Sequence, residues 1–365
     1  MMFTEVLTPS QYKAFYSFAS ELYKNNAYYR DTEHDVASML VEKKSVFFRH
    51  ADLIPLLITD NTGDIVLGRF CMVLDHQQPD MVQIGFFEAL PGLQGLGEKL
   101  FLEAKKRFPS CSRLVVGLNA HLNYGAGFLC SRFDEAPVFG LPYTMDYYIE
   151  YFKDYECKRM FSFRYPTQPF FEYYSRRKSH PSAEKIKVRT MRKRKLKEEV
   201  AIYTYLNNAS FQKHIYWSDR SEEEDYELFK PFGPMLDEEN LLIAEIDGNP
   251  AGFLLWYPDF NQLVKGSRHI GVLEWLRFRL FNPIDTFRFT EFGVHPRYRN
   301  SRVVDEMIRK LSEIIQQTPY TMLEGGFIFE ENASSIAVSL RYGLRSMRKA
   351  LEPYREYAVF ERQLR

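Results

Sequence analysis

Apolar positions recur along the chain with two spacings, and the order of the elements they predict is repeated. Short runs of β-branched and aromatic residues predict strands, whereas apolar residues three or four positions apart predict helices. In the first half the expected elements are a strand at 3–7, a helix from Ser10, strands at 53–59 and 65–73 around the turn 60–64, a strand at 82–88, a helix from Gly95 and a strand at 114–118. In the second half they are a strand at 187–191, a helix at 195–211, strands at 241–246 and 251–257, a strand at 286–294, a helix at 302–316, a strand at 321–329, a helix from Asn332 and a last strand at 357–362. One order therefore occurs twice, which predicts a tandem α/β (α+β) protein with two mixed sheets flanked by helices.

A polar segment at 175–184 separates the two halves. It reads SRRKSHPSAE and contains Pro181, a composition typical of a linker. A chain of 365 residues is also long for a single core. We therefore expect an N-terminal domain at 1–174, a linker at 175–184 and a C-terminal domain at 185–365.

Charge and cysteine content narrow the functional classes. Forty-eight basic and 48 acidic residues give a net charge of zero, which argues against nucleic acid as the main partner. No apolar run approaches the roughly 20 residues that a membrane span needs, and the N-terminus lacks the basic and apolar regions of a signal peptide. The four cysteines show no CxxC spacing, and no His or Cys set has metal-ligand spacing. We expect free thiols, no metal and a cytoplasmic location.

Each half contains a strand, a turn and a helix whose N-terminus faces the end of that strand. The first copy is Val82–Glu88 followed by Gln94–Leu100, and the second is Phe289–Pro296 followed by Arg297–Val304. A helix N-terminus presents unpaired N–H groups and the positive end of the helix dipole. The pattern therefore predicts a seat for a phosphate or pyrophosphate.

At these residues the chain resembles the GNAT (Gcn5-related N-acyltransferase) superfamily in a tandem form. That family binds acyl-CoA through a strand–loop–helix motif written [Q/R]-x-x-G-x-[G/A]. In the first half Gln94 and Gly97 match the motif, and Lys99 replaces its second small residue. In the second half Arg299 matches, but Arg302 and Val304 stand where the small residues belong. The segments 84–88 and 119–123 are also similar to a bacterial GNAT branch whose members are mostly uncharacterised.

The resemblance implies that acetyl-CoA or another acyl-CoA is the co-substrate, and we expect the first domain to bind it. The residues expected to hold it are Phe87, Gln94, Gly95, Leu96, Gly97, Glu98 and Lys99. Glu88 ends the strand beside this loop, where a carboxylate suits a base that takes a proton from an amine; the alternative is a carboxylate in solvent or in a salt bridge. Asn123 matches the asparagine of a later family motif and is the second catalytic candidate. The candidates in the second domain are Glu291, Val294, Arg299 and Asn332.

The expected function is transfer of an acetyl or longer acyl group to an amine of a small molecule or peptide. Neither half carries the full later motif, because Cys130 and Ser339 stand at its tyrosine position. This departure favours the alternative of a non-catalytic GNAT-fold ligand-binding or interaction protein. A third class is a Fem-type transferase that uses aminoacyl-tRNA, against which the neutral charge counts. The acyl length, the acceptor and the oligomeric state remain open.

Overall fold

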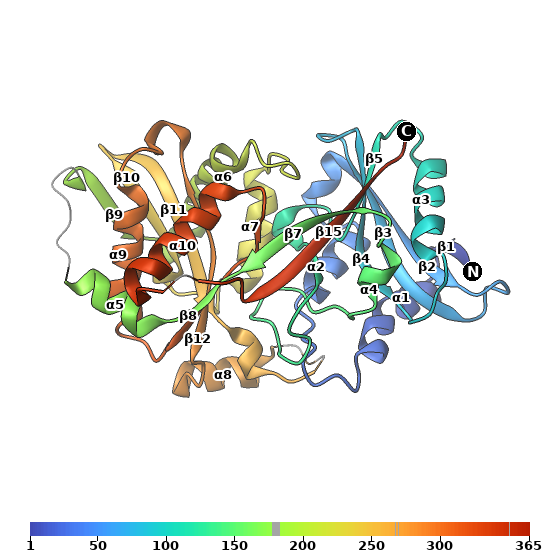
Figure 1. Ribbon diagram of the computed structural model, residues 1–365, viewed down its shortest axis with the longest axis horizontal. Coiled ribbons are helices and arrows are strands. Elements are labelled where there is room, and N and C mark those ends of the chain that lie inside the picture. Colours follow the sequence, from blue (N-terminus) through green and yellow to red (C-terminus); the bar gives the residue numbers. More distant parts are fainter. Residues whose placement is uncertain (177–182, 267, 269, 350) are drawn as a thin grey trace. The chain divides into compact units, whose positions relative to one another are not determined.

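The computed structural model describes residues 1–176, 183–266, 268, 270–349 and 351–365 (Figure 1). The chain forms two compact units. Unit 1 contains Met1–Phe161, the described residues of 264–268 and Arg355–Arg365. Unit 2 contains Ser162–Leu263 and Ile270–Tyr354. Each unit is described on its own below.

The sheet of unit 1 is mixed. Its strands are, in spatial order, β1 (Met2–Glu5), β2 (Ala51–Thr59), β3 (Val66–Asp75), β4 (Met81–Ala89), β5 (Arg113–Val116), β15 (Arg355–Gln363) and β7 (Glu156–Ser162), with β6 (Phe128–Leu129) paired to β15. The first four strands pair antiparallel, β4 and β5 run parallel, and β15 is antiparallel to β5. The helices are α1 (Pro9–Leu22), α2 (His34–Val41), α3 (Leu96–Arg107) and α4 (Tyr148–Tyr151), with short 3-10 turns at Val46–Arg49 and Leu122–Tyr124.

Local sequence accounts for where the helices of unit 1 begin and what they bury. The side chain of Thr8 caps α1, Gln11 completes a capping box, and Pro9 occupies the first turn. α3 ends on three basic residues, which suits the negative end of its dipole. Its apolar face, with Leu100 and Ala104, is buried in a core shared with the strands.

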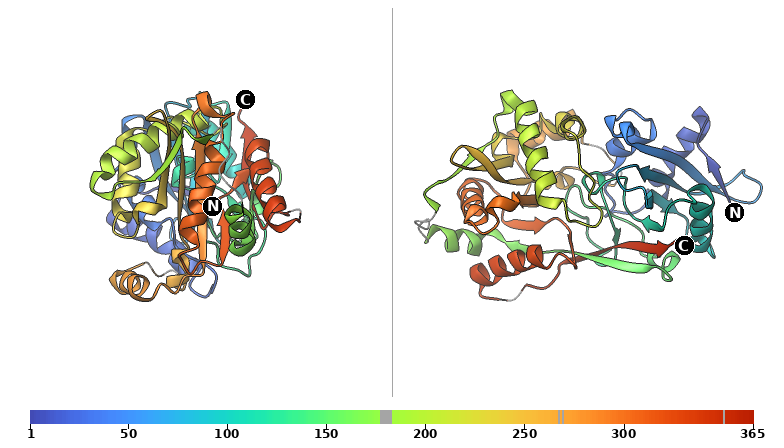
Figure 2. Two further views of the ribbon diagram at one scale, coloured as in Figure 1. Left: turned by 90° about the vertical axis from the view of Figure 1, so that its left-hand side faces the viewer. Right: turned by 90° about the horizontal axis from the view of Figure 1, so that it is seen from above.

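The sheet of unit 2 repeats this arrangement. Its order is β8 (Arg164–Pro166), β13 (Met322–Gly325), β12 (Thr286–Val294), β11 (Asn249–Pro258), β10 (Leu241–Ile246) and β9 (Ile186–Thr190), and only β12 and β13 run parallel among these strands. The other elements are β14 (Ile328–Phe329), α5 (Thr167–Ser175), α6 (Leu196–Phe211), α7 (Glu222–Phe232), α8 (Val272–Phe281), α9 (Val303–Ile315), α10 (Ala333–Met347) and 3-10 turns at Lys193–Lys195, Glu238–Asn240, Phe260–Leu263 and Pro296–Tyr298. α6 packs on β11 and β12, α9 packs on β9, β10 and β11, and α5 lies beside α9 and α10, so helices cover both faces of the sheet (Figure 2). The expected repeat of two mixed sheets flanked by helices is confirmed.

The two units divide the chain differently from the expected ranges 1–174 and 185–365. The last strand, β15, pairs with β5 through Phe360 and Val116 and belongs to unit 1. Conversely, β8 and α5 belong to unit 2, because Tyr165 pairs with Leu323 of β13. β15 thus supplies backbone hydrogen-bond partners to β5, and β8 supplies them to β13, so that neither β5 nor β13 is left as an unpaired edge. Of the expected linker 175–184, residues 177–182 lie outside the described residues.

Candidate functional site

β4 and β5 separate in unit 1 at a bulge. Their parallel pairing ends at Ile84 and Val116. Beyond it Phe86 has a φ of 50°, and its N–H donates to Oδ1 of Asn119 at 2.7 Å instead of to a strand. A β-carbon on Gly85 would lie 2.6 Å from the carbonyl oxygen of Leu118, so only glycine permits this turn of the strand. The strands splay from here, and β4 continues without β5 beside it.

A pocket opens at this bulge and lies within unit 1. Its empty volume, counted with the open solvent above it, is about 530 Å³. Its lining includes Glu33, Arg69, Phe87, Glu88, Asn119 and Tyr143. These residues come from β3, β4, the loops after α1 and β5, and the segment between β6 and α4, so the pocket brings together side chains that are far apart in the sequence.

Glu88 is a buried residue of the pocket lining. The hydroxyls of Tyr23 and Tyr148 both donate to Oε2 of Glu88, at 2.8 and 2.6 Å. Burial raises the pKa of Glu88 to about 7, partly offset by Arg69 and by the two tyrosine hydrogen bonds. Oε1 has no hydrogen-bond partner among the described residues and is not sealed from the pocket. A carboxyl anchored through one oxygen, with a pKa near neutrality, has the properties of a proton acceptor.

A second carboxyl of similar character lies in the same pocket. Nδ2 of Asn119 donates to Oε1 of Glu33 at 2.9 Å. Burial and the neighbouring Glu88 raise the pKa of Glu33 to about 7, and Arg69 opposes this shift. Asn119 therefore ties the bulge of β4 to this carboxyl through its two amide atoms.

Tyrosines in and beside α4 contact the loop and the first turn at the start of α3, where the anion seat is expected. The N–H of Leu93 donates to the hydroxyl of Tyr151 at 3.3 Å, and this hydroxyl donates to the carbonyl of Leu90 at 2.5 Å. A β-carbon on Gly97 would collide with the carbonyl oxygen of Tyr151. The glycine that matches the acyl-CoA motif thus permits the close approach of the chain itself.

The end of β4 is occupied in the same manner. The hydroxyl of Tyr147 donates to the carbonyl of Ala89 at 2.7 Å, and the N–H of Ala89 donates to the hydroxyl of Tyr148 at 3.0 Å. The ring of Phe87 packs edge-on against Tyr148 and Phe152. A CoA arm along this strand end would have to displace these hydroxyls.

The corresponding strand end in unit 2 carries no such cover. β12 and β13 separate after Phe289 and Gly325, and Thr290 is the extra residue of a bulge opposite Leu255 and Trp256. Beyond the bulge β12 pairs with β11 on one side only. On the other side, no side chain of the described residues forms a hydrogen bond with the backbone of residues 290–294. This edge is therefore without a hydrogen-bonding cap among the described residues, whereas tyrosine hydroxyls cap that of unit 1.

Arginines surround the start of the helix that follows. α9 begins at Val303 with Arg302 as its N-cap. Arg297, Arg299 and Arg302 are exposed. Arg299 donates to the carbonyl of Ser210 at 3.0 Å, and Arg302 pairs with Asp305 at 3.1 Å. Asp305 is in the first turn of α9, so the exposed side chain of Arg302 lies along the start of this helix.

Glu291 stands beside this open edge on the side of α6. The hydroxyl of Tyr203 donates to Oε1 of Glu291, and Nδ2 of Asn207 donates to that hydroxyl at 2.7 Å. Burial raises the pKa of Glu291 to about 7, and the hydrogen bond from Tyr203 opposes this shift. Glu291 thus repeats the arrangement of Glu88, with one carboxyl oxygen held by a tyrosine from the first long helical segment of its unit.

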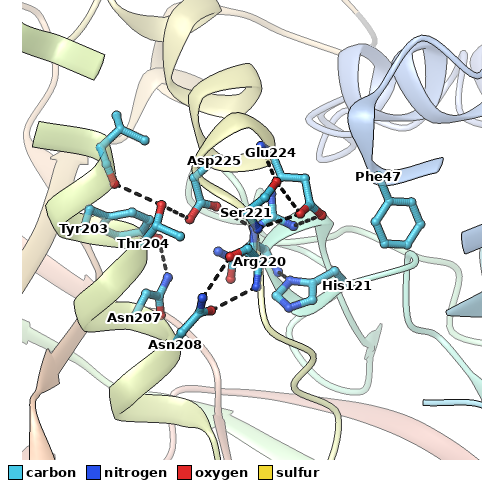
Figure 3. A network of polar contacts seen from close by, with 12 residues as sticks. Phe47, His121, Tyr203, Thr204, Asn207, Asn208, Arg220, Ser221, Glu224 and Asp225 are labelled. Carbon is cyan, nitrogen blue, oxygen red and sulfur yellow. Dashed lines mark hydrogen bonds and ion pairs between the residues drawn. The ribbon is translucent and has the colours of Figure 1, made fainter. Parts of the chain in front are cut away.

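A buried ion pair fixes the helix that carries Tyr203. Nε of Arg220 donates to Oδ1 of Asp225 at 2.5 Å, and Oγ1 of Thr204 donates to Oδ2 of Asp225 at 2.7 Å (Figure 3). Asn208 donates to the carbonyl of Arg220 and accepts from its N–H. These bonds tie α6 to the start of α7, so that Tyr203 is held in position.

The other expected residues lie apart from these two carboxyls. Asn123 is in the 3-10 turn after β5, outside the pocket lining, and its N–H donates to Nδ1 of His121 at 3.1 Å. Oδ1 of Asn332 accepts from the N–H of Ser335 at 3.1 Å and thereby caps α10. Gln94 and Lys99 are exposed, and Leu96 is buried in the core. Glu98 is paired with Arg362 at 2.5 Å.

Four residues at the site were not expected from the sequence. Tyr23 and Tyr148 hold the carboxyl of Glu88, Glu33 is the second carboxyl, and Arg69 lowers the pKa of both carboxyls. Arg69 lies opposite Glu88 in the pairing of β3 with β4. In a hairpin, opposite residues can be counted outward from the turn between the two strands. The bulge at Phe86 shifts that register, so counting from the turn alone does not find the pair.

Among the described residues, no helix has the length and apolar character needed to cross a bilayer. In that same part of the chain, no group of three or more His, Cys, Asp or Glu side chains is arranged to hold a metal ion.

Comparison with known proteins identifies the architecture. No family model matches the chain. Protein YghO of Escherichia coli K12 is 23% identical over 328 residues, which cover 84% of this chain and 81% of that protein. A tandem GNAT protein from the clavulanic acid biosynthesis pathway has a TM-score of 0.54 at 13% identity and covers all of this chain and 98% of its own. A GCN5-related glucosamine N-acetyltransferase region of a fungal multi-domain β-N-acetylglucosaminidase has a TM-score of 0.55 at 12% identity over 99% of this chain and 38% of its own. The chain therefore has the tandem GNAT fold that its sequence resembles.

Proposed function

We propose that the protein is an acyl-CoA-dependent N-acyltransferase in which unit 2 binds the acyl-CoA and Glu291 is the base. The observation that carries this proposal is the edge of β12 that is unpaired beyond its bulge, beside a carboxyl whose pKa is about 7. The equivalent edge in unit 1 is taken by Tyr147, Tyr148 and Tyr151. This assignment moves the expected acyl-CoA site from the first domain to the second.

The free backbone groups of residues 290–294 suit the amide-containing arm of CoA, because they can pair with it as a further strand would. The N-terminus of α9 and the exposed Arg299 and Arg302 suit its phosphates. Acetyl-CoA and longer acyl-CoAs share these groups, so the acyl length is set elsewhere.

The proposed chemistry is direct attack of an amine on the thioester. The carboxylate of Glu291 takes a proton from the amine, whose nitrogen then bonds to the carbonyl carbon. Backbone N–H groups at the strand edge suit the oxyanion that develops. The carbon–sulfur bond breaks, and CoA leaves as a thiolate that takes up a proton. The acceptor is an amine of a small molecule or peptide.

A second candidate function rests on unit 1. The tyrosines that cover α3 and the end of β4 favour a GNAT-fold unit that binds a ligand without acyl-CoA. In this second function unit 1 is a ligand-binding module, and ligand binding by unit 1 does not depend on acyl transfer by unit 2.

Calorimetry with CoA, acetyl-CoA and a longer acyl-CoA tests the proposal. Arg302→Glu reverses a charge at the N-terminus of α9, and we expect at least about tenfold weaker binding, or about 1.4 kcal/mol. Lys99→Glu makes the same reversal in the first turns of α3, where Lys99 is also exposed, and should leave binding unchanged. The opposite pattern would assign acyl-CoA to unit 1, and no binding of any of the three compounds would refute the transferase.

A further inference from the structure

The pocket of unit 1 contains a buried arginine that forms no ion pair with a carboxylate of the described residues, although Glu33 and Glu88 lie near enough for its charge to lower their pKa. Arg69 is 8% exposed. Nη1 donates to the carbonyl of Phe15 at 3.0 Å, and the guanidinium lies 5.0 Å from the centre of the Phe15 ring. Nε is sealed from solvent and has no acceptor among the described residues, and no ion pair to Arg69 is present in that part of the chain. A buried charge in this condition is costly unless an anion reaches it.

The carboxyl nearest in the sheet does not serve as that anion. Arg69 and Glu88 are directly opposite each other in the antiparallel pairing of β3 with β4, so their side chains leave the same face of the sheet. Tyr23 and Tyr148 hold Oε2 of Glu88, and no ion pair joins Glu88 to Arg69 among the described residues. The pocket therefore presents a cation and a proton acceptor side by side, with Nη2 of Arg69 and Oε1 of Glu88 left for a ligand.

The chemistry of these edges restricts the ligand. Nη1 already donates to Phe15 and Nε is sealed from solvent, so Nη2 is the nitrogen of the guanidinium that a ligand carboxylate can reach, with one charge-assisted hydrogen bond. Oε1 of Glu88 and the carboxyl of Glu33 favour a positively charged donor over a second anion. A phosphate, with its larger negative charge, would meet both carboxyls and is disfavoured.

We propose that this pocket binds the head group of a small α-amino acid, with the ligand carboxylate on Arg69 and its ammonium group on Glu88. Directly opposite strand residues have β-carbons roughly 4.5–5.5 Å apart, a spacing that the adjacent charges of an amino acid can bridge. Glu33 lies on the same wall and accepts from Asn119, which leaves its other oxygen for the ammonium group. The aromatic walls formed by Phe87 and Phe128 suit a small apolar side chain.

The site belongs to unit 1 and uses no acyl-CoA, so it stands or falls independently of the proposed transferase. Calorimetry on the full chain without acyl-CoA tests it, with glycine and L-alanine as probes. Propionate carries only the carboxylate, ethylamine only the ammonium group, and inorganic phosphate a different anion. We expect L-alanine or glycine to bind at least about tenfold more tightly than each of these three. Failure of both amino acids to bind, or equal affinity for propionate or phosphate, would overturn the proposal.

Two variants assign the contacts. Arg69→Met keeps an unbranched side chain in the core and removes the guanidinium. It should weaken the binding of L-alanine at least about tenfold. Arg113→Met makes the same change on β5, outside the pocket, and should bind as the unchanged chain does. Glu88→Gln should weaken the binding of L-alanine more than the binding of propionate. This variant tests the site even if Arg69→Met fails to fold. Unchanged binding in Arg69→Met or in Glu88→Gln would refute the assignment.

Discussion

The carbonyl oxygen of Tyr151 occupies the space that a β-carbon on Gly97 would need. The hydroxyl of Tyr155, four residues after the end of α4, also donates to the carbonyl of Gly97 at 2.9 Å. Gly97 is therefore contacted both by the last residue of α4 and by the segment that follows it. Gly97 is one of the two residues that match the acyl-CoA motif in the first half. In the structure this glycine is required for packing within unit 1, which accounts for a glycine at this position without a ligand.

Gly97→Ala should therefore destabilise unit 1 by about 1–3 kcal/mol, because the new methyl group meets backbone that cannot rotate away. Gly95→Ala is the matched comparison, since Gly95 has a φ of +66° and no atom within 4 Å of the added carbon. It carries only the strain of the left-handed conformation, about 1 kcal/mol. Urea unfolding of both variants measures the difference. Equal losses would show that α4 yields to the methyl group.

The repeated order of strands and helices was predictable because each element carries its own periodicity. The position of β15 was not, since alternation of apolar residues marks a strand without naming its partner. Tyr147, Tyr148 and Tyr151 illustrate the same limit, because a tyrosine-rich segment looks alike whether it lines a cleft or fills one. Glu88 and Glu291 were recognised as candidates from their place at strand ends. Their tyrosine partners come from distant segments, and only the folded chain reveals them.

Tyr148→Phe should destabilise unit 1 by about 1–3 kcal/mol, because the N–H of Ala89 loses its acceptor in a buried site. The same change removes one of the two hydrogen bonds that favour the carboxylate of Glu88, so its pKa should rise further. Unfolding experiments measure the first effect, and a carboxyl-selective NMR titration measures the second. A pKa of Glu88 that stays the same would mean that Tyr23 alone holds the carboxylate.

Glu88→Gln should change how stability depends on pH. Burial raises the pKa of Glu88 from near 4.5 to about 7, so the folded chain binds more protons than the unfolded chain between these values. The contribution of Glu88 to stability is therefore full below about pH 4.5 and is lost as pH rises through about 7. Glutamine is neutral throughout. Between pH 5 and pH 8 the free energy of unfolding of the variant should therefore rise relative to that of the chain with Glu88, by at most about 3 kcal/mol. Urea midpoints at the two pH values measure this gain, and a constant difference would contradict the raised pKa.

Glu291→Gln should lower the rate of acyl transfer about 10²–10⁴-fold and leave acyl-CoA affinity nearly unchanged, because only proton acceptance is lost. Thiol release from acetyl-CoA in the presence of an amine measures the rate, and calorimetry measures the affinity. Glu313→Gln, an exposed change on α9, is the control and should alter neither. A full rate in Glu291→Gln would exclude Glu291 as the base.

Tyr203→Phe should shift the pH dependence of that transfer. The hydroxyl of Tyr203 stabilises the carboxylate of Glu291, so its removal raises a pKa that already stands at about 7. A base must be ionised to act, and the rise of the rate with pH should therefore move to higher pH. Asp225, Arg288 and Arg220 act on Glu291 in both forms of the chain, so the difference isolates the hydroxyl. The rate at pH 6 should fall by a larger factor than the rate at pH 9. An equal loss at both values would mean that Tyr203 positions α6 and does not tune the base.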